Sequence, residues 1–317
     1  MTINGVALMT EKLYHEMFDA GLRARLGRTV RLGVPLGEAE ALITGWGSPR
    51  LDAELLDRAP RLRVVAHTGG SVKALVTPAC WERALLVTSA AAANAVPVAD
   101  YTIGAILLAA KRVPAYAALY RANAGQWEWR SHVPDPVSPR RTAGVIGFSR
   151  IGRRVVELLR HFDFDVLVTD PYAEARDVPA ELTTLDDLLA QCDIVTLHAP
   201  ATQETQHLLD ARRLAMLRDG ATVINTARGS LIDTDALTAE CVKGRLSAVL
   251  DVTDPEPLPP DSPLYHLPHV MLTPHVAGAM GGEMRRLAEL AVDELERYAR
   301  GEPLLHRVHP EHLDRLA

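Results

Sequence analysis

Short apolar runs alternate with amphipathic stretches along most of the chain, and the clearest alternation lies between Ala143 and Asp170. An apolar run ends at Phe148, a turn of small residues follows, and the next apolar residues are spaced as on one face of a helix: Ile151, Val155, Val156, Leu158, Leu159 and Phe162. A second run, rich in β-branched residues, ends on Asp170. This order predicts a strand, a helix and a second parallel strand, which together form a βαβ unit.

The same alternation continues as far as Thr273. Strand-like runs end near Phe148, Asp170, His198, Thr226, Asp251 and Thr273. Helical runs lie between several of them, at Leu185–Gln191, Asp210–Leu217 and Thr234–Lys243. Strands that alternate with helices in this way predict a doubly wound parallel sheet, because parallel neighbours need crossover connections.

A smaller α/β domain is predicted from the first part of the chain. Its β-like runs are Val6–Leu8, Leu42–Thr44, Arg63–Ala66 and Leu85–Val87, and its helix-like runs are Glu11–Arg25 and Asp52–Arg58. The third of these strands leads into Thr68-Gly69-Gly70-Ser71, whose backbone N–H groups could hold an anion. On this stretch alone, a plain glycine-rich loop is the favoured interpretation.

The connection between the two patterns is apolar. From Ser89 to Ala110 the chain is almost uncharged, but Asn94, Pro97 and Asp100 interrupt the run and favour a loop followed by a buried helix over a membrane span. We expect that helix to begin after Pro97 and to run from Val98 to about Asn123, because proline is common in the first turn of a helix.

Two other segments complete the pattern. Gly125–Arg141 has no clear period and is expected to be a loop in which Trp127 and Trp129 act as packing anchors. A last helix is predicted over Glu283–Arg300, ending at Gly301.

Composition narrows the function classes. A chain of 317 residues suits two domains, and its net charge of −6 gives no general attraction to nucleic acid or to an anionic membrane. Its three cysteines, Cys80, Cys192 and Cys241, show neither metal-ligand spacing nor a disulfide framework, so no metal is expected. The first residues lack the pattern of a signal peptide, and a cytoplasmic location is expected.

The turn after the first strand of the βαβ unit carries most of a dinucleotide-binding fingerprint. The pattern G-x-G-x-x-G would place its three positions at Gly147, Ser149 and Gly152, followed by an acid, Asp170, at the distance expected for the ribose contact. Ser149 stands where the backbone must approach the pyrophosphate, and a small hydroxymethyl group is tolerable there. An ordinary βα turn is the competing interpretation of the glycine pattern alone.

Polar residues follow the later strands, and the carboxyl ends of parallel strands are where ligands bind in an open sheet. Arg228, Asp251, Glu256 and His275 are therefore expected to meet at one edge of the sheet. Taken singly, each has a structural explanation, such as an ion pair or a loop hydrogen bond. Their recurrence at successive strand ends favours a shared site.

The motifs resemble those of the NAD-dependent D-isomer-specific 2-hydroxyacid dehydrogenases. The resemblance covers nearly the whole chain and rests on the loop Gly69-Gly70-Ser71 and on the stretches GVIGFSRIG, VTDPY, LHAP, NTARGSLID, DVTDPEP and TPHVAG. It implies a Rossmann domain, residues 96–282, inserted into a smaller flavodoxin-like substrate domain built from residues 1–95 and 283–317. It also implies NAD as cofactor, reversible reduction of a small 2-oxo acid to the D-2-hydroxy acid, and a homodimer formed through the helix near Val98.

The resemblance assigns roles to individual residues. Arg228 would bind the substrate carboxylate and carbonyl oxygen, His275 would be the general acid or base, and Glu256 would orient the histidine and favour its protonated form. Gly70 and Ser71 would contact the substrate together with Arg228 and His275. The implied cofactor contacts are Gly147, Ser149, Arg150, Ile151, Asp170, His198, Ala199, Pro200, Thr205, Thr226, Ala227, Arg228, Asp251, His275 and Gly278.

Three positions depart from the usual family pattern. Ser149 replaces the central glycine, where its side chain could either weaken dinucleotide affinity or donate a hydrogen bond to a phosphate oxygen. Asp100 stands where glutamate is usual, and Lys73 stands where aspartate is common. Lys73 and His67 flank the glycine-rich loop and raise the hypothesis of a substrate with a second negative charge, such as a phosphonate or phosphate. The favoured alternative is that Lys73 points to solvent on a helix.

Three other functions are weighed against this one. Formate and phosphite dehydrogenases share the architecture, but both are disfavoured. The formate-type acid–base pair has glutamine where Glu256 stands, and the phosphite-type lysine would fall near Gly70, which is not basic. A regulatory NAD-binding protein, like the corepressors of this fold, stays open because such proteins can retain the Arg228, Glu256 and His275 set. The charge Asp170 would bring to the ribose site favours NAD over NADP.

Overall fold

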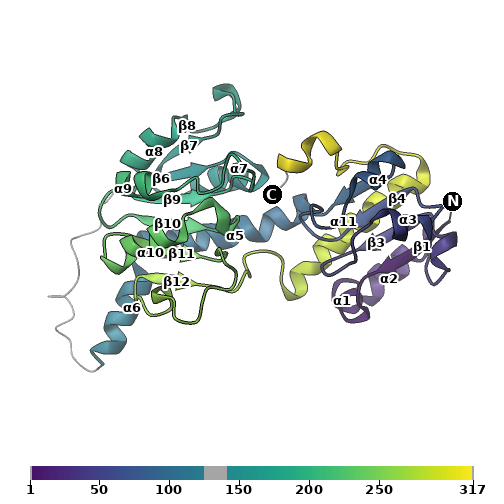
Figure 1. Ribbon diagram of the computed structural model, residues 1–317, viewed down its shortest axis with the longest axis horizontal. Helices are drawn as coiled ribbons and strands as arrows, with labels where there is room; N and C mark the ends of the chain where they lie inside the picture. The colour runs from purple at the N-terminus through teal and green to yellow at the C-terminus, as the bar shows by residue number, and fades with distance from the viewer. Residues whose placement is uncertain (1, 125–140, 316–317) are drawn as a thin grey trace. The chain divides into compact units, whose positions relative to one another are not determined.

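The computed structural model describes residues 2–124 and 141–315, and Figure 1 shows its ribbon. The expected loop with Trp127 and Trp129 lies outside these residues, apart from its last member, Arg141. The described chain forms two compact units, residues 1–97 with 278–317 and residues 98–277. The sequence placed the domain boundaries at 95/96 and 282/283.

The first unit holds a parallel sheet whose described strands lie in the order β2-β1-β3-β4-β5. This is the order of flavodoxin-like folds. Its strands are β1 (Ile3–Leu8), β2 (Val30–Arg31), β3 (Ala41–Thr44), β4 (Val64–His67) and β5 (Leu86–Ser89). Its helices are α1 (Glu11–Met17), α2 (Ala20–Leu26), α3 (Ala53–Asp57), α4 (Pro78–Glu82) and α11 (Met284–Arg300).

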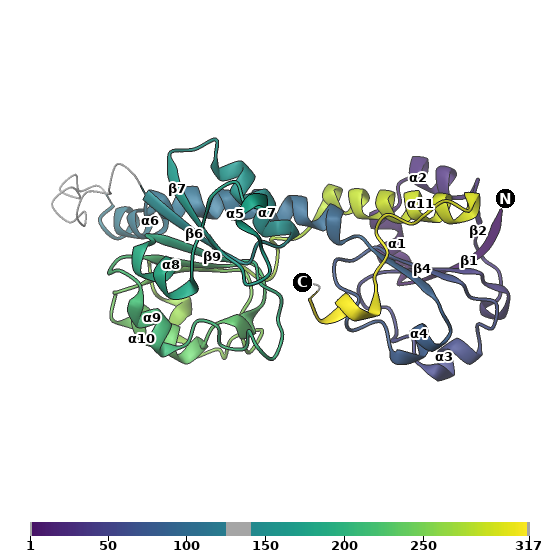
Figure 2. The ribbon, with the colours of Figure 1, turned by 90° about the horizontal axis from the view of Figure 1, so that it is seen from above.

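Both faces of this sheet are covered, which explains its continuous apolar strands. Side chains of α1, α2 and α11 pack with Ile43 and Ala66 on one face. Side chains of α3 and α4 pack with Leu42 and Val65 on the other. Figure 2 shows the two helix layers on opposite sides of the strands.

The second unit holds a parallel sheet whose described strands lie in the order β12-β11-β10-β9-β6-β7-β8. Counted from its first strand, this is the order 3-2-1-4-5-6 of a Rossmann fold with one further edge strand. Its strands are β6 (Arg141–Ile146), β7 (Phe164–Thr169), β8 (Glu181–Leu182), β9 (Ile194–Leu197), β10 (Thr222–Asn225), β11 (Ser247–Leu250) and β12 (Val270–Leu272). The predicted fold class is confirmed.

Two helical layers cover this sheet as well (Figure 2). On one face lie α5 (Ala91–Ala110), whose second part belongs to this unit, α6 (Val113–Ala122) and α7 (Arg150–Leu159). On the other lie α8 (Leu185–Gln191), α9 (Ala211–Met216) and α10 (Thr234–Val242). The six predicted strand ends fall within two residues of the observed ones.

The predicted connecting helix is wrong at its start and in its continuity. Helix α5 begins at Ala91 and contains Pro97, and a break at Arg112, with φ of 51°, separates it from α6. Pro114 lies in the first turn of α6, where a missing N–H costs no intrahelical hydrogen bond. The preference of proline for the first turn of a helix is thus seen at Pro114 of α6, whereas Pro97 lies inside α5.

The helix predicted over Glu11–Arg25 is two helices. Asp19 ends the first run, because its side chain accepts a hydrogen bond from the N–H of Leu22 at 2.7 Å and caps α2. The two-residue strands β2 and β8 and the short helix α4 were not predicted. Helix α5 is also the one described helix long and apolar enough to cross a membrane, but half of its apolar window is buried, as in the core helix of a globular protein.

Candidate active site

The turn after β6 is shaped by two glycines. Gly147 has φ of +95°, and a β-carbon there would lie 2.6 Å from the backbone nitrogen of Ala199. A β-carbon on Gly152 would lie 2.0 Å from the carbonyl oxygen of Gly147. Both contacts are too short for any side chain, so the glycines permit the close approach of α7 to the strands.

Ser149 is the N-cap of α7, with Arg150 and Ile151 as the first residues of the helix. The Oγ of Ser149 accepts a hydrogen bond from the N–H of Gly152 at 3.3 Å. Its φ of −69° is open to every residue, so the backbone conformation does not require glycine at this position. The serine occupies one N–H at the helix start and keeps its own hydroxyl hydrogen for a further partner.

Asp170, directly after β7, is held by the backbone. One carboxylate oxygen accepts a hydrogen bond from the N–H of Phe148 at 2.7 Å, and the other accepts from the N–H of Tyr172 at 2.8 Å. The carboxylate thus ties the end of β7 to the turn after β6. Arg153 lies over the ring of Phe148, 4.2 Å from its centroid, so a cation lies on this turn although no basic residue follows Asp170 closely in sequence.

His198, directly after β9, is fully buried. Burial lowers the pKa of its imidazole to about 3, so the ring is neutral at physiological pH. Its Nε2 lies 3.0 Å from the hydroxyl of Thr196, and its Nδ1 has no partner among the described residues. The following residues, Ala199 and Pro200, lead into a loop in which the hydroxyl of Thr205 donates to the carbonyl of Pro200 at 2.6 Å.

Arg228 is positioned by the turn after β10. The side-chain oxygen of Asn225 accepts from the N–H of Ala227 at 3.0 Å, and its amide nitrogen donates to the carbonyl of Arg228 at 2.8 Å. Burial lowers the pKa of the Arg228 guanidinium, while the nearby Glu256 carboxylate opposes that shift. The guanidinium remains charged at neutral pH.

Two further contacts fix this turn. A β-carbon on Gly229 would lie 2.0 Å from the carbonyl of Thr253, so the turn after β10 packs directly against the backbone that leads to Glu256. The hydroxyl of Thr226 lies 3.0 Å from that of Thr102 on α5. Neither Gly229 nor Thr102 was predicted as part of the site; Gly229 lies in the NTARGSLID stretch, whereas no local signal marks Thr102.

Asp251, directly after β11, is buried and organises the loop after β12. Its carboxylate accepts hydrogen bonds from the hydroxyl of Thr273 at 2.6 Å and from the N–H groups of Val276 and Ala277, both at 2.8 Å. Its backbone carbonyl accepts from the N–H of His275 at 2.9 Å. Three donors to one carboxylate compensate for its burial.

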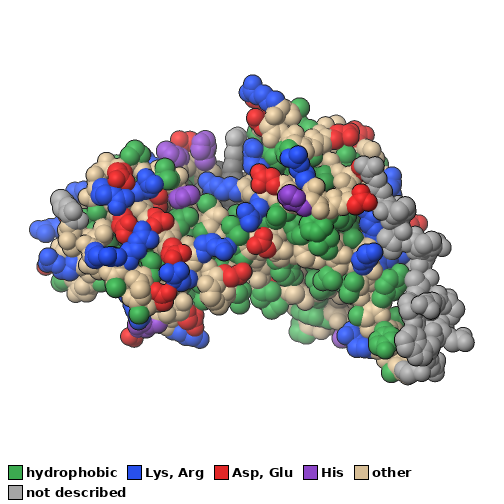
Figure 3. Space-filling view, turned by 180° about the vertical axis from the view of Figure 1, so that it is seen from behind, with side chains coloured by type: hydrophobic (Ala, Val, Ile, Leu, Met, Phe, Trp, Pro, Cys, Tyr) green, Lys and Arg blue, Asp and Glu red, His purple; other side chains and the backbone are tan. Residues whose placement is uncertain are grey.

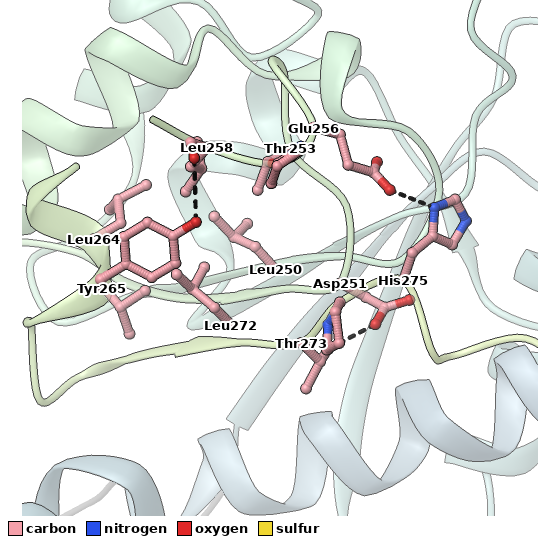
Figure 4. A pocket seen from close by; sticks show the side chains of 13 residues that line it. Leu250, Asp251, Thr253, Glu256, Leu258, Leu264, Tyr265, Leu272, Thr273 and His275 are labelled. Atoms are coloured by element: carbon pink, nitrogen blue, oxygen red, sulfur yellow. Dashed lines mark hydrogen bonds and ion pairs between the residues drawn. The ribbon is translucent and has the colours of Figure 1, made fainter. Parts of the chain in front are cut away.

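His275 and Glu256 form a pair. The Nδ1 of His275 lies 2.7 Å from a carboxylate oxygen of Glu256, and both side chains are about half exposed. Figure 4 shows the carboxylate pointing to the ring from the opposite loop. With Nδ1 engaged, the Nε2 nitrogen is left for a reacting group, which is the arrangement expected of a general acid or base.

A cavity of about 610 Å³ adjoins this pair and is lined mainly by apolar side chains from β11, β12 and the loop between them. Its lining residues are Leu250, Asp251, Thr253, Glu256, Pro257, Leu258, Leu264, Tyr265, Val270, Leu272, Thr273, Pro274 and His275. None of these is Lys or Arg. In Figure 4 the cavity lies on the Glu256 side of the His275 ring.

The glycine-rich loop of the first unit follows β4. A β-carbon on Gly70 would lie 3.3 Å from the side-chain nitrogen of Asn94, and one on Gly278 would lie 3.2 Å from its oxygen. Asn94, whose Oδ1 accepts from the N–H of Ala279 at 2.9 Å, therefore brings the predicted substrate residue Gly70 and the predicted cofactor residue Gly278 together. The sequence had marked Asn94 only as an interruption of an apolar run.

His67 does not carry the charge that was attributed to it. The ring is buried, its Nδ1 lies 3.0 Å from the hydroxyl of Thr44, and burial lowers its pKa to about 4. It is therefore neutral at physiological pH. The Oγ of Ser71 accepts from the N–H of Lys73 at 3.4 Å, which closes a local turn in the same loop.

Residues 103–277 match the family model for the NAD-binding domain of D-isomer specific 2-hydroxyacid dehydrogenases, which is more than half of the chain. The chain belongs to this family. It is an NAD-dependent oxidoreductase that acts on the CH–OH group of donors. Within residues 2–124 and 141–315, no group of three or more His, Cys, Asp and Glu side chains is placed to hold a metal ion.

The relatives of this dehydrogenase include glyoxylate reductase from Thermofilum pendens, 36% identical over 263 residues, which are 80% of this chain and 76% of the relative. D-3-phosphoglycerate dehydrogenase from Archaeoglobus fulgidus is 30% identical over 312 residues, 95% of this chain but 58% of the relative. A D-isomer specific 2-hydroxyacid dehydrogenase from Xanthobacter autotrophicus, solved with NADPH and MES, has a TM-score of 0.77 and 26% identity over 98% of this chain and 99% of that one.

The turn after β6 fits the backbone of a dinucleotide. Gly147 and Gly152 leave no side chain between the strand ends and the first turn of α7, where N–H groups and the helix dipole favour a phosphate. The Nδ1 of His198 at the neighbouring strand end is buried without a partner in the described part of the chain, which is a second feature that a bound group would satisfy. The residues of this dehydrogenase therefore suit NAD.

Proposed function

We propose that the protein reduces a 2-oxo acid to the D-2-hydroxy acid with NADH, in a reversible reaction, with His275 as the acid–base residue. The observation that carries the proposal is the 2.7 Å contact between His275 and Glu256, beside the loop that presents Arg228. A histidine oriented by a carboxylate can give a proton to a carbonyl oxygen that gains charge. Beside it, a partly buried arginine can bind the anionic end of the substrate.

Each residue has a distinct task in this proposal. In reduction His275 donates its Nε2 proton to the carbonyl oxygen, and in oxidation the same nitrogen accepts the hydroxyl proton. Glu256 holds the ring through Nδ1 and balances the positive charge of the imidazolium. Arg228 binds the substrate carboxylate and stabilises charge on the carbonyl oxygen, where its partial burial strengthens both interactions.

The cofactor site would be formed by the strand ends. NADH, when bound, supplies the hydride that reduces the substrate carbon. Gly147, Ser149, Arg150 and Ile151 would bind the pyrophosphate, and Asp170 the adenosine ribose. The remaining contacts are proposed for His198, Ala199, Pro200, Thr205, Thr226, Ala227, Arg228, Asp251, His275 and Gly278.

A second negative charge on the substrate is supported less well by the structure than by the sequence. The neutral ring of His67 adds no positive charge beside Gly70 and Ser71, and the cavity next to Glu256 is lined by carboxylates and apolar groups. Lys73 is the remaining cation of that hypothesis. The phosphoglycerate dehydrogenase relative is the argument in favour of a dianionic substrate.

The decisive test is NADH oxidation with paired monoanionic and dianionic 2-oxo acids, such as glyoxylate and phosphonopyruvate. We expect His275→Ala to lower kcat by about 10²–10⁴-fold, the usual contribution of general acid–base catalysis. Glu256→Gln, which keeps the shape but removes the charge, should lose less. Lys73→Ala should affect only the dianionic acids if a second charge is recognised.

Other outcomes have clear meanings. Full turnover by His275→Ala would contradict its proposed role. NADH binding without turnover of any 2-oxo acid in the panel would favour the regulatory, corepressor-like alternative. Glu256→Asp, which retains the charge on a shorter side chain, is the control that separates charge from geometry.

We predict at least a tenfold preference for NADH over NADPH in kcat/KM, because the Asp170 carboxylate would repel a 2′-phosphate. Asp170→Ala should reduce this ratio about tenfold or more. Asp163→Ala, which removes an exposed carboxylate between α7 and β7, should leave the ratio unchanged. The measurement is KM and kcat with both cofactors. Equal use of NADPH by the wild-type protein would overturn the assignment, and a relative solved with NADPH makes this comparison necessary.

A homodimer is proposed through α5 and α6. Leu108, Val113 and Tyr120 on these helices are large apolar side chains that are 42%, 37% and 59% exposed. Figure 3 shows hydrophobic side chains gathered on the face that carries these helices, with charged groups of both signs interspersed elsewhere. Such a patch is typical of an interface between subunits. Sedimentation analysis of the wild-type protein and Leu108→Glu should show a dimer and a monomer, respectively.

A further inference from the structure

One chain of hydrogen bonds in the second unit has no assigned task. The hydroxyl of Tyr101 on α5 lies 2.7 Å from the hydroxyl of Thr273, which lies 2.6 Å from a carboxylate oxygen of Asp251. An ionised carboxylate can only accept, so the Thr273 hydroxyl donates to Asp251. Tyr101 must then donate to Thr273, and the direction of both hydrogen bonds is fixed.

This series of hydrogen bonds ends at the backbone that follows His275. Asp251 also accepts from the N–H groups of Val276 and Ala277, which directly follow the histidine. His275 itself has φ of +55°, in the left-handed region that residues with a β-carbon rarely adopt. A conformation of this kind persists only when its surroundings hold it, and here the hydrogen bonds to Asp251 do so.

We propose that Tyr101 and Thr273 are positioning residues for His275 and act on it through Asp251. This inference rests on the proposed function of His275. Thr273 fixes one oxygen of the carboxylate, and Tyr101 fixes the rotamer of Thr273 from the helix below. The carboxylate, in turn, sets the backbone that aims the imidazole. Figure 4 shows Thr273 and Asp251 side by side beneath His275.

The surroundings suit this task. Burial raises the pKa of the Tyr101 phenol, so it remains protonated and able to donate throughout the neutral range. Asp251 is buried, and its two oxygens receive three donors from one short segment. Small displacements of a catalytic group can cost a large part of its rate advantage, so loss of one such anchor should appear in catalysis.

The test compares Thr273→Val, which keeps the shape without the hydroxyl, with Thr273→Ser, which keeps the hydroxyl. We expect Thr273→Val to lower kcat by about 10–100-fold. Thr273→Ser should recover kcat to within about threefold of wild type. Tyr101→Phe, which removes only the outer link, should lose about 3–10-fold.

The same substitutions in a His275→Ala background separate positioning from general damage. If Thr273 acts through His275, Thr273→Val should change the residual rate of that variant less than about twofold. An equal loss in both backgrounds would overturn the inference, as would an unchanged kcat in Thr273→Val alone. Full activity of His275→Ala by itself would instead overturn the proposed function, and with it any positioning of that residue.

A readout that needs no turnover completes the test. Hydrogen exchange at the amides of Val276 and Ala277 should be at least about tenfold faster in Thr273→Val than in the wild-type protein, because the carboxylate that protects both amides loses its anchor. Amides in β9 serve as the internal reference. Unchanged protection of both amides would overturn the inference, whatever the substrate of the enzyme is.

Discussion

The turn after β6 and the loop after β12 lie at the same edge of one sheet and are held in different ways. In the turn, Gly147 and Gly152 fit because they have no side chain, and a β-carbon on either would collide with backbone. In the loop, a buried side chain is what holds the backbone, since Asp251 binds the hydroxyl of Thr273 and two N–H groups. The first arrangement depends on packing and the second on hydrogen bonds.

This difference implies different consequences of substitution. A side chain added to the turn displaces a helix and two strands, so stability and cofactor affinity should change together. A hydrogen bond removed from the loop leaves the sheet in place and moves only a few residues around His275. Catalysis can then change with little loss of stability. The turn is thus a structural requirement, whereas the loop sets the orientation of one group.

The largest effect is expected for Gly147→Ala. Its φ of +95° strains any residue with a β-carbon, and that β-carbon would lie only 2.6 Å from the backbone nitrogen of Ala199. We expect a loss of about 4 kcal/mol or more in the free energy of unfolding, with NADH binding lost in parallel. Urea unfolding and NADH fluorescence measure the two effects.

Gly104 supplies the matched control. It lies inside α5, and a β-carbon there meets nothing within 4 Å. Gly104→Ala should therefore stabilise the protein slightly, by up to about 1 kcal/mol, because alanine favours a helix over glycine. Normal stability of Gly147→Ala would show that the turn can adjust, and would remove the contrast between the turn and the loop.

The sequence predicted some elements of the fold well and missed others. Apolar periodicity predicted six strands of the Rossmann sheet, and the glycine spacing marked the turn, because both are local patterns. The strands β2 and β8 are two residues long and leave no period to detect. Pro97 was predicted to start a helix, because a proline in a sequence does not reveal whether it lies in the first turn of a helix or in its interior. In the structure it lies in the interior, and α5 continues past it because the helix packs against the sheet.

The candidate site was predictable where a residue follows its own strand. Arg228, Asp251 and His275 are examples, because strand ends converge in a parallel sheet. Asn94, Tyr101 and Thr102 lie on a helix far from these residues in sequence, and their partners are set only by packing of that helix. Asp251 was predicted to contact the cofactor, and nothing in the sequence indicated its hydrogen bonds to the loop that holds His275.

A smaller effect is expected at low pH, again in the turn. His198 packs its backbone against Gly147, and its ring has a pKa of about 3, compared with about 6.5 in an unfolded chain. Between these values the unfolded state binds more protons, so stability falls as the pH is lowered from 6.5 toward 3. At pH 5 the loss from this group should be about 2 kcal/mol.

Urea unfolding at pH 7 and pH 5 measures this loss, and substitution isolates it. His198→Gln cannot titrate, so the difference between its stabilities at the two pH values should be about 2 kcal/mol smaller than for the wild-type protein. His67 contributes in the same direction in the first unit, and it is present in both proteins. The exposed His161→Gln should keep the wild-type difference. Identical pH dependence in His198→Gln would show that the ring is charged or solvated in the folded state.

The smallest effect distinguishes the two roles of Ser149. As a cap, its Oγ accepts from the N–H of Gly152, and glycine is a nearly equal N-cap, so Ser149→Gly should cost only a few tenths of a kcal/mol. Ser149→Ala should cost about 1 kcal/mol, because alanine is a poor cap.

If the hydroxymethyl group hinders the pyrophosphate, Ser149→Gly should bind NADH more tightly despite the weaker cap. If the hydroxyl binds a phosphate oxygen, the affinity of Ser149→Gly for NADH should fall instead. Because the serine backbone has no strain to relieve, a change in NADH affinity would report contact with the cofactor alone. Unchanged affinity would show that this turn is defined by Gly147 and Gly152, and that its middle position accepts any small residue.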